Sequence, residues 1–468
     1  MVDDRIMDDM QERVLDQHQR DQYLAFGFVP ELPDSDRLPL LSDWSMPPRR
    51  SPRSVSESTL VREGVRALRA AFEQGALAAH GRGDQVVLLS GGLDSRAILG
   101  GLLEAYGPSE VVAASFGSAG EQDLEFATQV AGAAGVRHEV LESFSVDWTT
   151  QGLVDSVLAR DVPLPNPFGQ RYLSYRLHQQ IGIDHDFWDG LCGDQTAGVI
   201  SREGDDRATW AEALSFFLDL HVMPDWDRYT SPSFRPASAL PAAPLCDSAV
   251  LSHPDQLMFG VRQTRLTSTR LMRGYAIHTP FLTRPWLDFM LSVPIHHRRD
   301  RRLYLSVLRR AYPRLFQLPT TTFDGVGVPA PWLRKAVVLQ RRAVRKAERM
   351  GWPSRSGGTP DSGANNAIRR SHLHRADIRE LILQNLDDLA SRGLVPGLDP
   401  EATARAMAQR RISDTRIGVL LGLELNLKAV EQLRADKKRV RPGRVRPLPQ
   451  ELTPAHSAPD GGSPAHGR

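Results

Sequence analysis

The segment VVLLSGGLDSRAILGG, residues 86–101, decides the fold of this chain. It begins with a short, fully apolar run, which is typical of a strand buried in a parallel sheet. SGGLDS (Ser90–Ser95) then turns the chain, and a helical stretch follows from about Asp94. A strand, a glycine turn and a helix in this order predict a concave loop whose backbone amides favour anionic oxygens.

Each polar residue of this loop has a chemical use. Gly91 and Gly92 allow backbone angles and a close approach that a side chain would forbid. Ser90 and Ser95 add hydroxyl donors. Asp94 would repel a phosphate unless a Mg²⁺ ion lay between them, because hard cations take carboxylate and phosphate oxygens together. The plainer alternative is that Asp94 caps the helix and the glycines only make a turn.

The pattern of strand and helix continues on both sides of this loop. We expect a helix over 58–80, strands over 86–90, 111–117, 137–142 and 186–189, and helices from about Asp94 and over 122–135. Alternating strands and helices predict an α/β fold with a doubly wound parallel sheet. After about residue 199 helical periodicity takes over, with helices expected near 207–222, 254–274, 301–311, 332–349, 376–393 and 414–435.

These patterns predict four regions. Residues 1–57 are expected to be an irregular N-terminal segment, and 58–200 to be the α/β core that carries the glycine loop. Residues 201–433 should form a mainly helical region that completes the active site. Residues 434–468, which are basic and then rich in Pro, Gly and Ser, are expected to be disordered, and 354–366 to be a loop.

Composition excludes several classes of function. The formal net charge is +2, so the chain as a whole carries no electrostatic signature of nucleic-acid binding. It has no apolar stretch of about 20 residues and no apolar signal core near Met1, so we expect a cytoplasmic protein. Its two cysteines, Cys192 and Cys246, cannot build a disulfide framework or a four-ligand zinc site.

The motifs resemble a known family. SGGLDS is similar to the pyrophosphate-loop (PP-loop) motif of N-type ATP pyrophosphatases, and with its surroundings it looks like the synthetase domain of class B asparagine synthetases. Four further segments resemble that family in the same order, and the resemblance spans roughly 58–340. These segments are SFGSAGEQDLEFATQVAGAAGVRHEVLE (115–142), DGLCGDQTAG (189–198), TPFLTRPWLDFMLSVP (279–294) and LPTTTFDGVGVPAPWL (318–333).

The resemblance implies an ATP-dependent ligase that activates a carboxylate as an acyl-adenylate, releases pyrophosphate and forms an amide. ATP and Mg²⁺ are the implied cofactors, with Asp94 and Asp194 as metal ligands and Asp94, Asp194 and Ser95 as catalytic residues. The second-strand segment would hold the adenine, and Asp123 would face the pyrophosphate. The implied nucleotide-binding residues are Leu88, Ser90, Gly91, Gly92, Asp94, Ser95, Ser115, Phe116, Asp123 and Gly190.

The sequence also departs from that family. Val2 stands where the family exposes a catalytic cysteine, and the region before the core is short, so we expect no glutaminase activity. Leu191 aligns with the acidic residue that acts as base for amine attack, and Phe323 with the lysine that stabilises acyl transfer. The E-x-R ahead of the third segment and its final Asp are replaced as well, at Ala276, His278 and Thr283. Simple aspartate is therefore not the expected substrate.

Three readings of function stay open. The first is an amide-forming ligase for a small-molecule or peptide carboxylate, whose amine is ammonia, a group on the same substrate, a small amine or the product of a separate glutaminase. The second is another PP-loop ligase, such as an NAD, GMP or lysidine synthetase. The third is a catalytically degenerate ATP-binding regulator or assembly factor, which Leu191 and Phe323 favour.

Three further residues of the acceptor half are candidates for a functional role. His278, Tyr275 and Asp324 are candidates for a substitute base or a substrate contact, although ordinary packing is the simpler expectation. The arginine runs at 298–302 and 341–348 are expected to lie on solvated helix faces.

Overall fold

The computed structural model describes residues 15–31, 47–50, 55–79, 81, 83–160, 166–263, 266, 270–323, 325–330, 333, 375–409 and 411–439. The expected helix over 332–349, the expected loop over 354–366 and the arginine run over 341–348 fall outside these residues, apart from Leu333, as does Asp324. No helix in the described part of the chain is both long and apolar enough to cross a membrane.

The centre of the fold is a five-stranded sheet in which every strand is parallel to its neighbours, in the order β3-β2-β1-β4-β5. This confirms the predicted α/β class and the doubly wound sheet. The strands are β1 Gln85–Leu88, β2 Val111–Gly117, β3 Arg137–Glu142, β4 Asp186–Trp188 and β5 Ala276–His278. The sequence did not reveal β5, because three half-buried residues are too few to show a period.

Alternate residues of the strands face two different layers of helices. Val87 and Trp188 are fully buried in the cluster that contains α3 Glu57–Ala78 and α4 Asp94–Ala105. Val86 and Phe187 are fully buried on the opposite face, where Leu177 of α7 Gln170–Ile181 covers them. A strand buried on both faces has to be apolar throughout, which explains the unbroken run that opens the deciding segment.

Most elements of the core follow the predicted boundaries. The helix expected over 58–80 is α3, the one expected over 122–135 is α5 Gln122–Ala134, and β2 and β3 match within one residue. Two helices between β3 and β4 were not predicted, α6 Thr150–Leu158 and α7.

The second half of the chain is mainly helical. Helices are present near 207–222, 301–311, 376–393 and 414–435, as expected. Between 254 and 274 the described residues include the end of a short helix and the π turn that continues it. The helices beyond β4 are α8 Gly193–Thr196, α9 Trp210–His221, α10 Trp226–Tyr229, α11 His253–Leu257, η5 Met258–Gln263, α13 Arg284–Ser292, α14 Ile295–Arg298, α15 Arg302–Ala311, α16 Pro313–Gln317, α19 Ala376–Ser391, α20 Pro400–Ala408 and α21 Asp414–Arg439.

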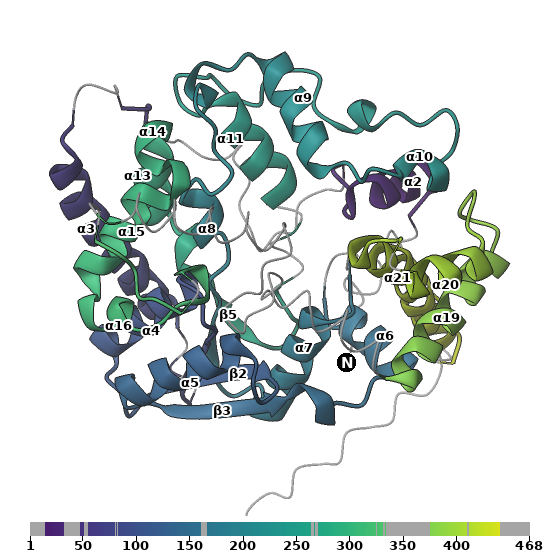
Figure 1. Cartoon of the computed structure of the whole chain (residues 1–468), viewed down its shortest axis with the longest axis horizontal. Helices are drawn as coiled ribbons and strands as arrows, with labels where there is room; N and C mark the ends of the chain where they lie inside the picture. The colour runs from purple at the N-terminus through teal and green to yellow at the C-terminus, as the bar shows by residue number, and fades with distance from the viewer. Residues whose placement is uncertain are drawn as a thin grey trace, which may run out of the picture.

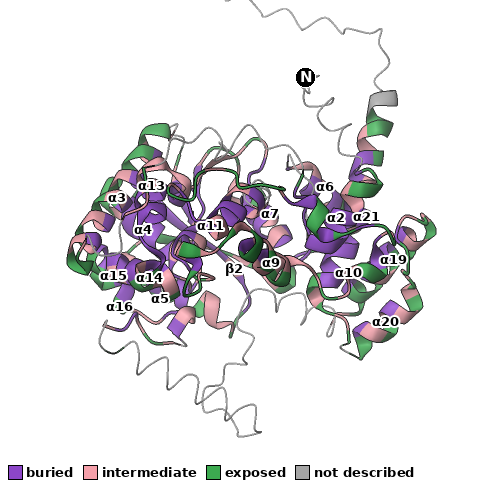
Figure 2. Cartoon of the chain, turned by 90° about the horizontal axis from the view of Figure 1, so that it is seen from above, coloured by how far each residue is buried: buried purple, intermediate pink, exposed green. Residues whose placement is uncertain are grey.

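Two groups of these helices lie at opposite ends of the molecule (Figure 1). Helices α13, α15 and α16 lie with α3 and α4 beside the sheet, whereas α19, α20 and α21 pack at the other end (Figure 1). The view from above shows the same separation, with buried residues filling both groups (Figure 2). Each group therefore has its own apolar core, and α7 contributes residues to the second one.

The N-terminal segment differs from the expectation of irregular chain. Gln17–Phe26 forms the helix α2. A capping box between Asp16 and Gln19 begins this helix, and Gly27, which has a left-handed backbone conformation, ends it. Tyr23 and Leu24 are fully buried against α21, and buried Arg416 donates a hydrogen bond of 2.6 Å to the carbonyl of Leu24. The charged neighbours of this short helix hid its two core residues. At the other end, α21 runs to Arg439, and 440–468 lie outside the described residues.

The topology marks one place for a ligand. From β1 the chain winds outward through β2 to β3, and it then returns to place β4 on the other side of β1. The connections after β1 and β4 therefore part in opposite directions and leave a crevice at the carboxyl ends of these two strands. Doubly wound sheets bind their ligands at such a switch point. The glycine turns that follow β1 and β4 are the two motifs quoted above.

The buried side chain of Arg96 should be one of the main supports of this crevice. Its guanidinium donates to the carbonyls of Leu315, Leu318 and Pro319 at 3.0, 3.0 and 2.7 Å and so ties α4 to the segment after α16. Arg96→Met should lower the free energy of unfolding by about 3 kcal/mol or more, because it leaves buried carbonyls without donors. Arg69→Met is the control in a denaturant titration, since the exposed Arg69–Glu104 pair should be worth less than about 1 kcal/mol. Equal losses would contradict this account.

Candidate active site

The loop after β1 is organised by its own serines. The Ser90 amide donates to Oγ of Ser95 at 3.1 Å, and the two hydroxyls lie 3.0 Å apart. The Gly92 amide donates to Oγ of Ser90 at 3.2 Å. These bonds curl the chain around the start of α4 and place Ser90, Gly91, Gly92 and Ser95 on one turn, as the sequence predicts. The turn sits at the helix N-terminus, where the peptide dipoles favour an anion.

A carboxylate already contacts this turn. Oδ1 of Asp123, in the first turn of α5, accepts a hydrogen bond of 3.0 Å from the Gly91 amide. Burial, the largest influence, raises the pKa of this carboxyl above its ordinary value, and the hydrogen bond from Gly91 opposes the rise. The predicted position of Asp123 beside the loop is therefore observed. This bond shows that the Gly91 amide donates to a carboxylate oxygen.

The loop after β4 packs directly on Asp94. A Cβ atom built at Gly193 would collide with the Asp94 carboxyl group, and one at Gly190 would come within 2.9 Å of the Asp94 Cβ. The backbone amide of Asp194 donates to Oδ2 of Asp94 at 3.0 Å. Thr196 then fixes the loop, because its hydroxyl accepts a hydrogen bond of 3.0 Å from the Trp286 indole. Glycine is required at 190 and 193 for this close approach.

Asp94 and Asp194 thus meet in space, 100 residues apart in the chain. Oδ1 of Asp94 accepts a hydrogen bond of 2.6 Å from the Tyr304 hydroxyl. The guanidinium of Arg301 lies on Asp194, with Nε 2.7 Å from Oδ1 and an N–H donated to Oδ2 at 2.8 Å. The two acids that the sequence predicts as metal ligands are therefore neighbours, because the Asp194 backbone contacts the Asp94 carboxylate, and one tyrosine and one arginine bond to their carboxylates.

The electrostatics of this pair are unusual. Burial, with a further contribution from the Asp194 charge, raises the pKa of the Asp94 carboxyl to about 8. Burial and the neighbouring Asp94 also raise the pKa of Tyr304 well above its ordinary value, so the tyrosine stays a hydrogen-bond donor. Burial and the Asp194 charge both disfavour the ionised form of Asp94, and a cation bound beside this carboxyl would favour it.

The donors suit Mg²⁺ held together with phosphate. No group of three or more His, Cys, Asp or Glu that could hold a metal ion occurs among the described residues. Mg²⁺ is commonly bound by one or two carboxylates plus phosphate oxygens and water, so two acids are enough. Each carboxylate oxygen also keeps a second lone pair beyond the contacts described. Asp94 and Asp194 would hold the ion, and it would neutralise charge on the phosphates beside the loop.

The remaining predicted residues lie at the ends of the inner strands. Ser115 is buried, donates to the Leu89 carbonyl at 2.8 Å and lies 2.8 Å from Nε2 of His138. Leu88 and Phe116 are half-buried on the sheet face that α7 covers. These contacts place the three residues near the crevice and leave their role toward the adenine a prediction.

Two partners of the acids were missed in the sequence, and both come from the start of α15. Arg301 belongs to the arginine run that was expected to be solvated, yet it contacts Asp194, and Tyr304 follows three residues later on the same face. Arg298, in the same run, is only 1% exposed and donates to Asp255 at 2.5 Å. The run resembled a solvated face because arginines dominate it, and the buried Leu303 and Leu308 carry the helical period that points Tyr304 inward.

The departures from the family take defined places. Phe323 is buried in the core beside α4 and α5, where it supplies packing and no charge. His278 lies 2.8 Å from the buried Asp186, and Tyr275 packs edge-on against Phe187 and His178, which matches the simpler expectation of packing for both. Leu191 is half-buried in the second loop.

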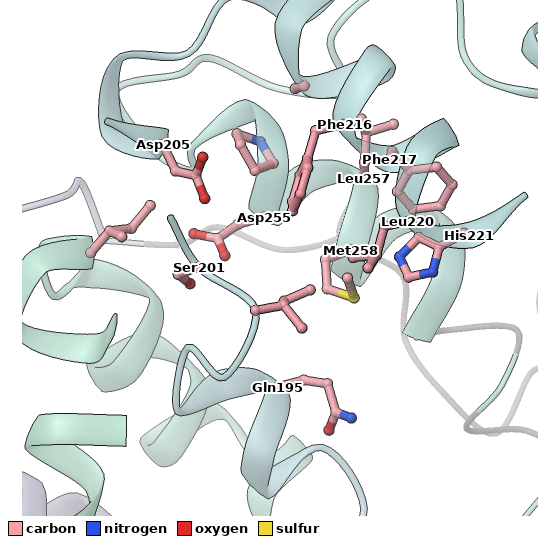
Figure 3. Close-up of a pocket in the computed structure, with 14 residues that line it drawn as sticks. Gln195, Ser201, Asp205, Phe216, Phe217, Leu220, His221, Asp255, Leu257 and Met258 are labelled. Atoms are coloured by element: carbon pink, nitrogen blue, oxygen red, sulfur yellow. The ribbon is translucent and has the colours of Figure 1, made fainter. Parts of the chain in front are cut away.

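A small pocket adjoins the second loop. Gln195 and Ser201 lie at one side of it and α9 and α11 at the other (Figure 3). Most of its wall is apolar, from Phe216, Phe217, Leu257 and their neighbours. Burial lowers the pKa of His221 at its rim to about 3, so this imidazole is neutral.

The fold and the crevice define a doubly wound α/β protein with a candidate ligand site at the switch point of its sheet. Residues 68–181 match the family described as asparagine synthase, so this part of the chain is similar to proteins of that family. The match includes the loop after β1, β2 and β3, and it ends before the loop after β4. None of the curated proteins compared with the chain is significantly similar to it in sequence.

The raised pKa of Asp94 predicts a pH-dependent stability. Between about pH 4 and pH 8 the folded, metal-free protein keeps a proton on this carboxyl that the unfolded chain has lost, so this group makes the folded state less stable as pH rises. Asp94→Asn removes that dependence. The free energy of unfolding of the variant minus that of the wild type should therefore increase from pH 5 to pH 8, by at most about 1.4 kcal/mol per pH unit.

Denaturant titrations in EDTA at several pH values check this prediction. Asp387→Asn, a change at an exposed acid on α19, is the matched control and should leave the profile unchanged. A constant difference between Asp94→Asn and the wild type would show that Asp94 is ionised throughout.

Proposed function

We propose that the protein is an AMP-forming ligase that joins a carboxylate to an amine, with ATP and Mg²⁺. The observation that carries the proposal is the contact between Asp94 and the loop of Asp194 beside the glycine turn. This arrangement combines a backbone cradle for phosphates with two carboxylates for a metal ion at the switch point of the sheet. The family match at 68–181, whose family consists of ATP-dependent amide-forming ligases, supports the same class.

The proposed reaction has two steps. An oxygen of the substrate carboxylate bonds to the α-phosphorus of ATP, and the bond between that phosphorus and the β-phosphate oxygen breaks. Pyrophosphate leaves with the electron pair, and its growing charge has to be balanced. The amides of Gly91 and Gly92, the hydroxyls of Ser90 and Ser95, and a cation held by the two acids would balance it. In the second step an amine nitrogen bonds to the carbonyl carbon of the acyl-adenylate, and the bond from that carbon to the phosphate oxygen breaks. AMP leaves with the electron pair, and the proton of the nitrogen passes to AMP or to water.

The substrate is a carboxylate other than simple aspartate. Leu191 cannot accept a proton from an incoming amine, and Phe323 is packed into the core, so the family's two acceptor-side groups have no counterpart at these positions. The amine would be ammonia, a group on the same substrate or a small amine. A screen of candidate acids by ATP–pyrophosphate exchange identifies the carboxylate. Release of ADP in place of AMP would refute the proposed chemistry.

The second candidate function is an ATP-binding protein without ligase activity, and the same two positions favour it. The two proposals differ in one measurement. Both require ATP binding, but only the ligase exchanges radioactive pyrophosphate into ATP when its carboxylate is present. Binding of ATP with no exchange across a broad panel of acids and peptides would select the second candidate.

Asp94 should be essential for the exchange reaction. Asp94→Asn should reduce the rate by about 10²-fold, which is the typical effect of removing one preorganised electrostatic contact. The exposed change Asp387→Asn serves as the control and should retain full activity. The assay is pyrophosphate exchange with the carboxylate that the screen identifies. Full activity of Asp94→Asn would remove this residue from the mechanism.

A further inference from the structure

Arg301 stands on a strained turn in front of α15. Asp300 and Arg301 both have left-handed backbone conformations, with φ of 57° and 59°. Such conformations are uncommon for residues other than glycine, and strained residues cluster at ligand-binding and switch sites. The two flanks of the turn are well anchored. Arg298 is buried in its pair with Asp255, and Leu303 is packed in the core beside α3.

The turn points a cation at the metal-binding acids. Arg301 contacts both oxygens of Asp194, and its positive charge also lowers the pKa of Asp94, against the larger effect of burial. The guanidinium remains 23% exposed and Asp194 37% exposed, so the pair borders the open side of the crevice. Arg301 thus contacts both carboxylate oxygens of Asp194, and a metal ion bound to Asp194 would have to share these oxygens with it.

A Mg²⁺ ion and the Arg301 guanidinium compete for Asp194, because both are positively charged and repel each other. When a Mg²⁺ ion binds between Asp94 and Asp194, the guanidinium loses its carboxylate partner and faces a double positive charge. It then needs another anion within reach of its side chain. Phosphates laid on the turn at Ser90–Ser95 supply that anion, because Asp94 belongs to both the turn and the acid pair.

We propose that Arg301 is a resident counter-ion that neutralises Asp194 in the nucleotide-free site and moves to the triphosphate when Mg²⁺ and ATP bind. This inference rests on the proposed function only insofar as the site binds ATP. In its second position the guanidinium binds the phosphates that depart as pyrophosphate and stabilises their charge. Arg301 thereby supplies a positive charge to the site, whereas the buried Phe323, which aligns with the family's lysine, supplies none.

The test is the binding of a non-hydrolysable ATP analogue, α,β-methylene-ATP, measured by calorimetry with Mg²⁺ and again with EDTA. Arg301→Gln should weaken binding in Mg²⁺ by about 10- to 100-fold, as expected for the loss of a charge-assisted hydrogen bond. It should also lower the midpoint of thermal unfolding in EDTA, and Mg²⁺ alone should restore much of that loss. Arg299→Gln is the matched control, because Arg299 lies on the same turn and pairs with the exposed Glu203.

An affinity of Arg301→Gln for the analogue that is unchanged or higher in Mg²⁺ overturns the inference. If Arg301 serves only as a structural counter-ion that competes with the metal, Arg301→Gln will bind the analogue in Mg²⁺ as tightly as the wild type, or more tightly. Should this variant fail to fold, Arg301→Lys decides, because it keeps the charge and loses the two-pronged contact. It should bind more weakly than the wild type in Mg²⁺, and unchanged affinity would refute the inference. Absence of binding by the wild type would refute the proposed function as well, whereas normal binding by both proteins refutes this inference alone.

Discussion

The structure depends on the contact between Asp94 and the loop that carries Asp194. Two carboxylates at this distance repel each other, and burial strengthens the repulsion because the interior screens charge less than water does. The protein holds them together by tight backbone packing, with Gly190 and Gly193 admitting Asp94 where any side chain would collide. Tyr304 and Arg301 then supply a hydrogen bond and a positive charge. Such an arrangement is costly for stability and is suited to binding a cation.

The rest of the fold brings these groups together. Parallel strands place their carboxyl ends at one edge, and the reversal of winding between β1 and β4 puts the two glycine turns next to each other. Arg96 ties α4 to the segment that follows α16, and the Thr321 amide in that segment donates to the Gly91 carbonyl at 3.0 Å. The phosphate loop is therefore supported from the sheet, from α5 and from the helical half of the chain.

The sequence predicted the sheet from local signals, and it predicted the acid pair from the resemblance of its motifs to a known family. The apolar run of β1, the glycines and the acidic residues are each visible in a few consecutive letters, and the order of the motifs places them at one edge. Arg301, Tyr304 and β5 could not be found in this way. Their positions depend on how α15 packs on α3 and on how three residues pair with β4, which are long-range contacts without a local signature. Helix α2 was missed for the same reason, because its buried face packs on α21, which lies near the other end of the sequence.

In the candidate site, protein side chains bond to the groups that would bind the phosphates and the metal ion. A loop amide that favours an anion is bonded to the Asp123 carboxylate, and a carboxylate that favours a cation is bonded to Arg301. Each half of the site thus holds a protein group with the charge of its expected ligand. Triphosphate oxygens are negatively charged like Asp123, and Mg²⁺ is positively charged like Arg301. Each ligand carries more charge than the side chain, so each can replace it. Because ATP brings phosphate and metal together, the two replacements are coupled, and neither ligand alone satisfies both halves of the site.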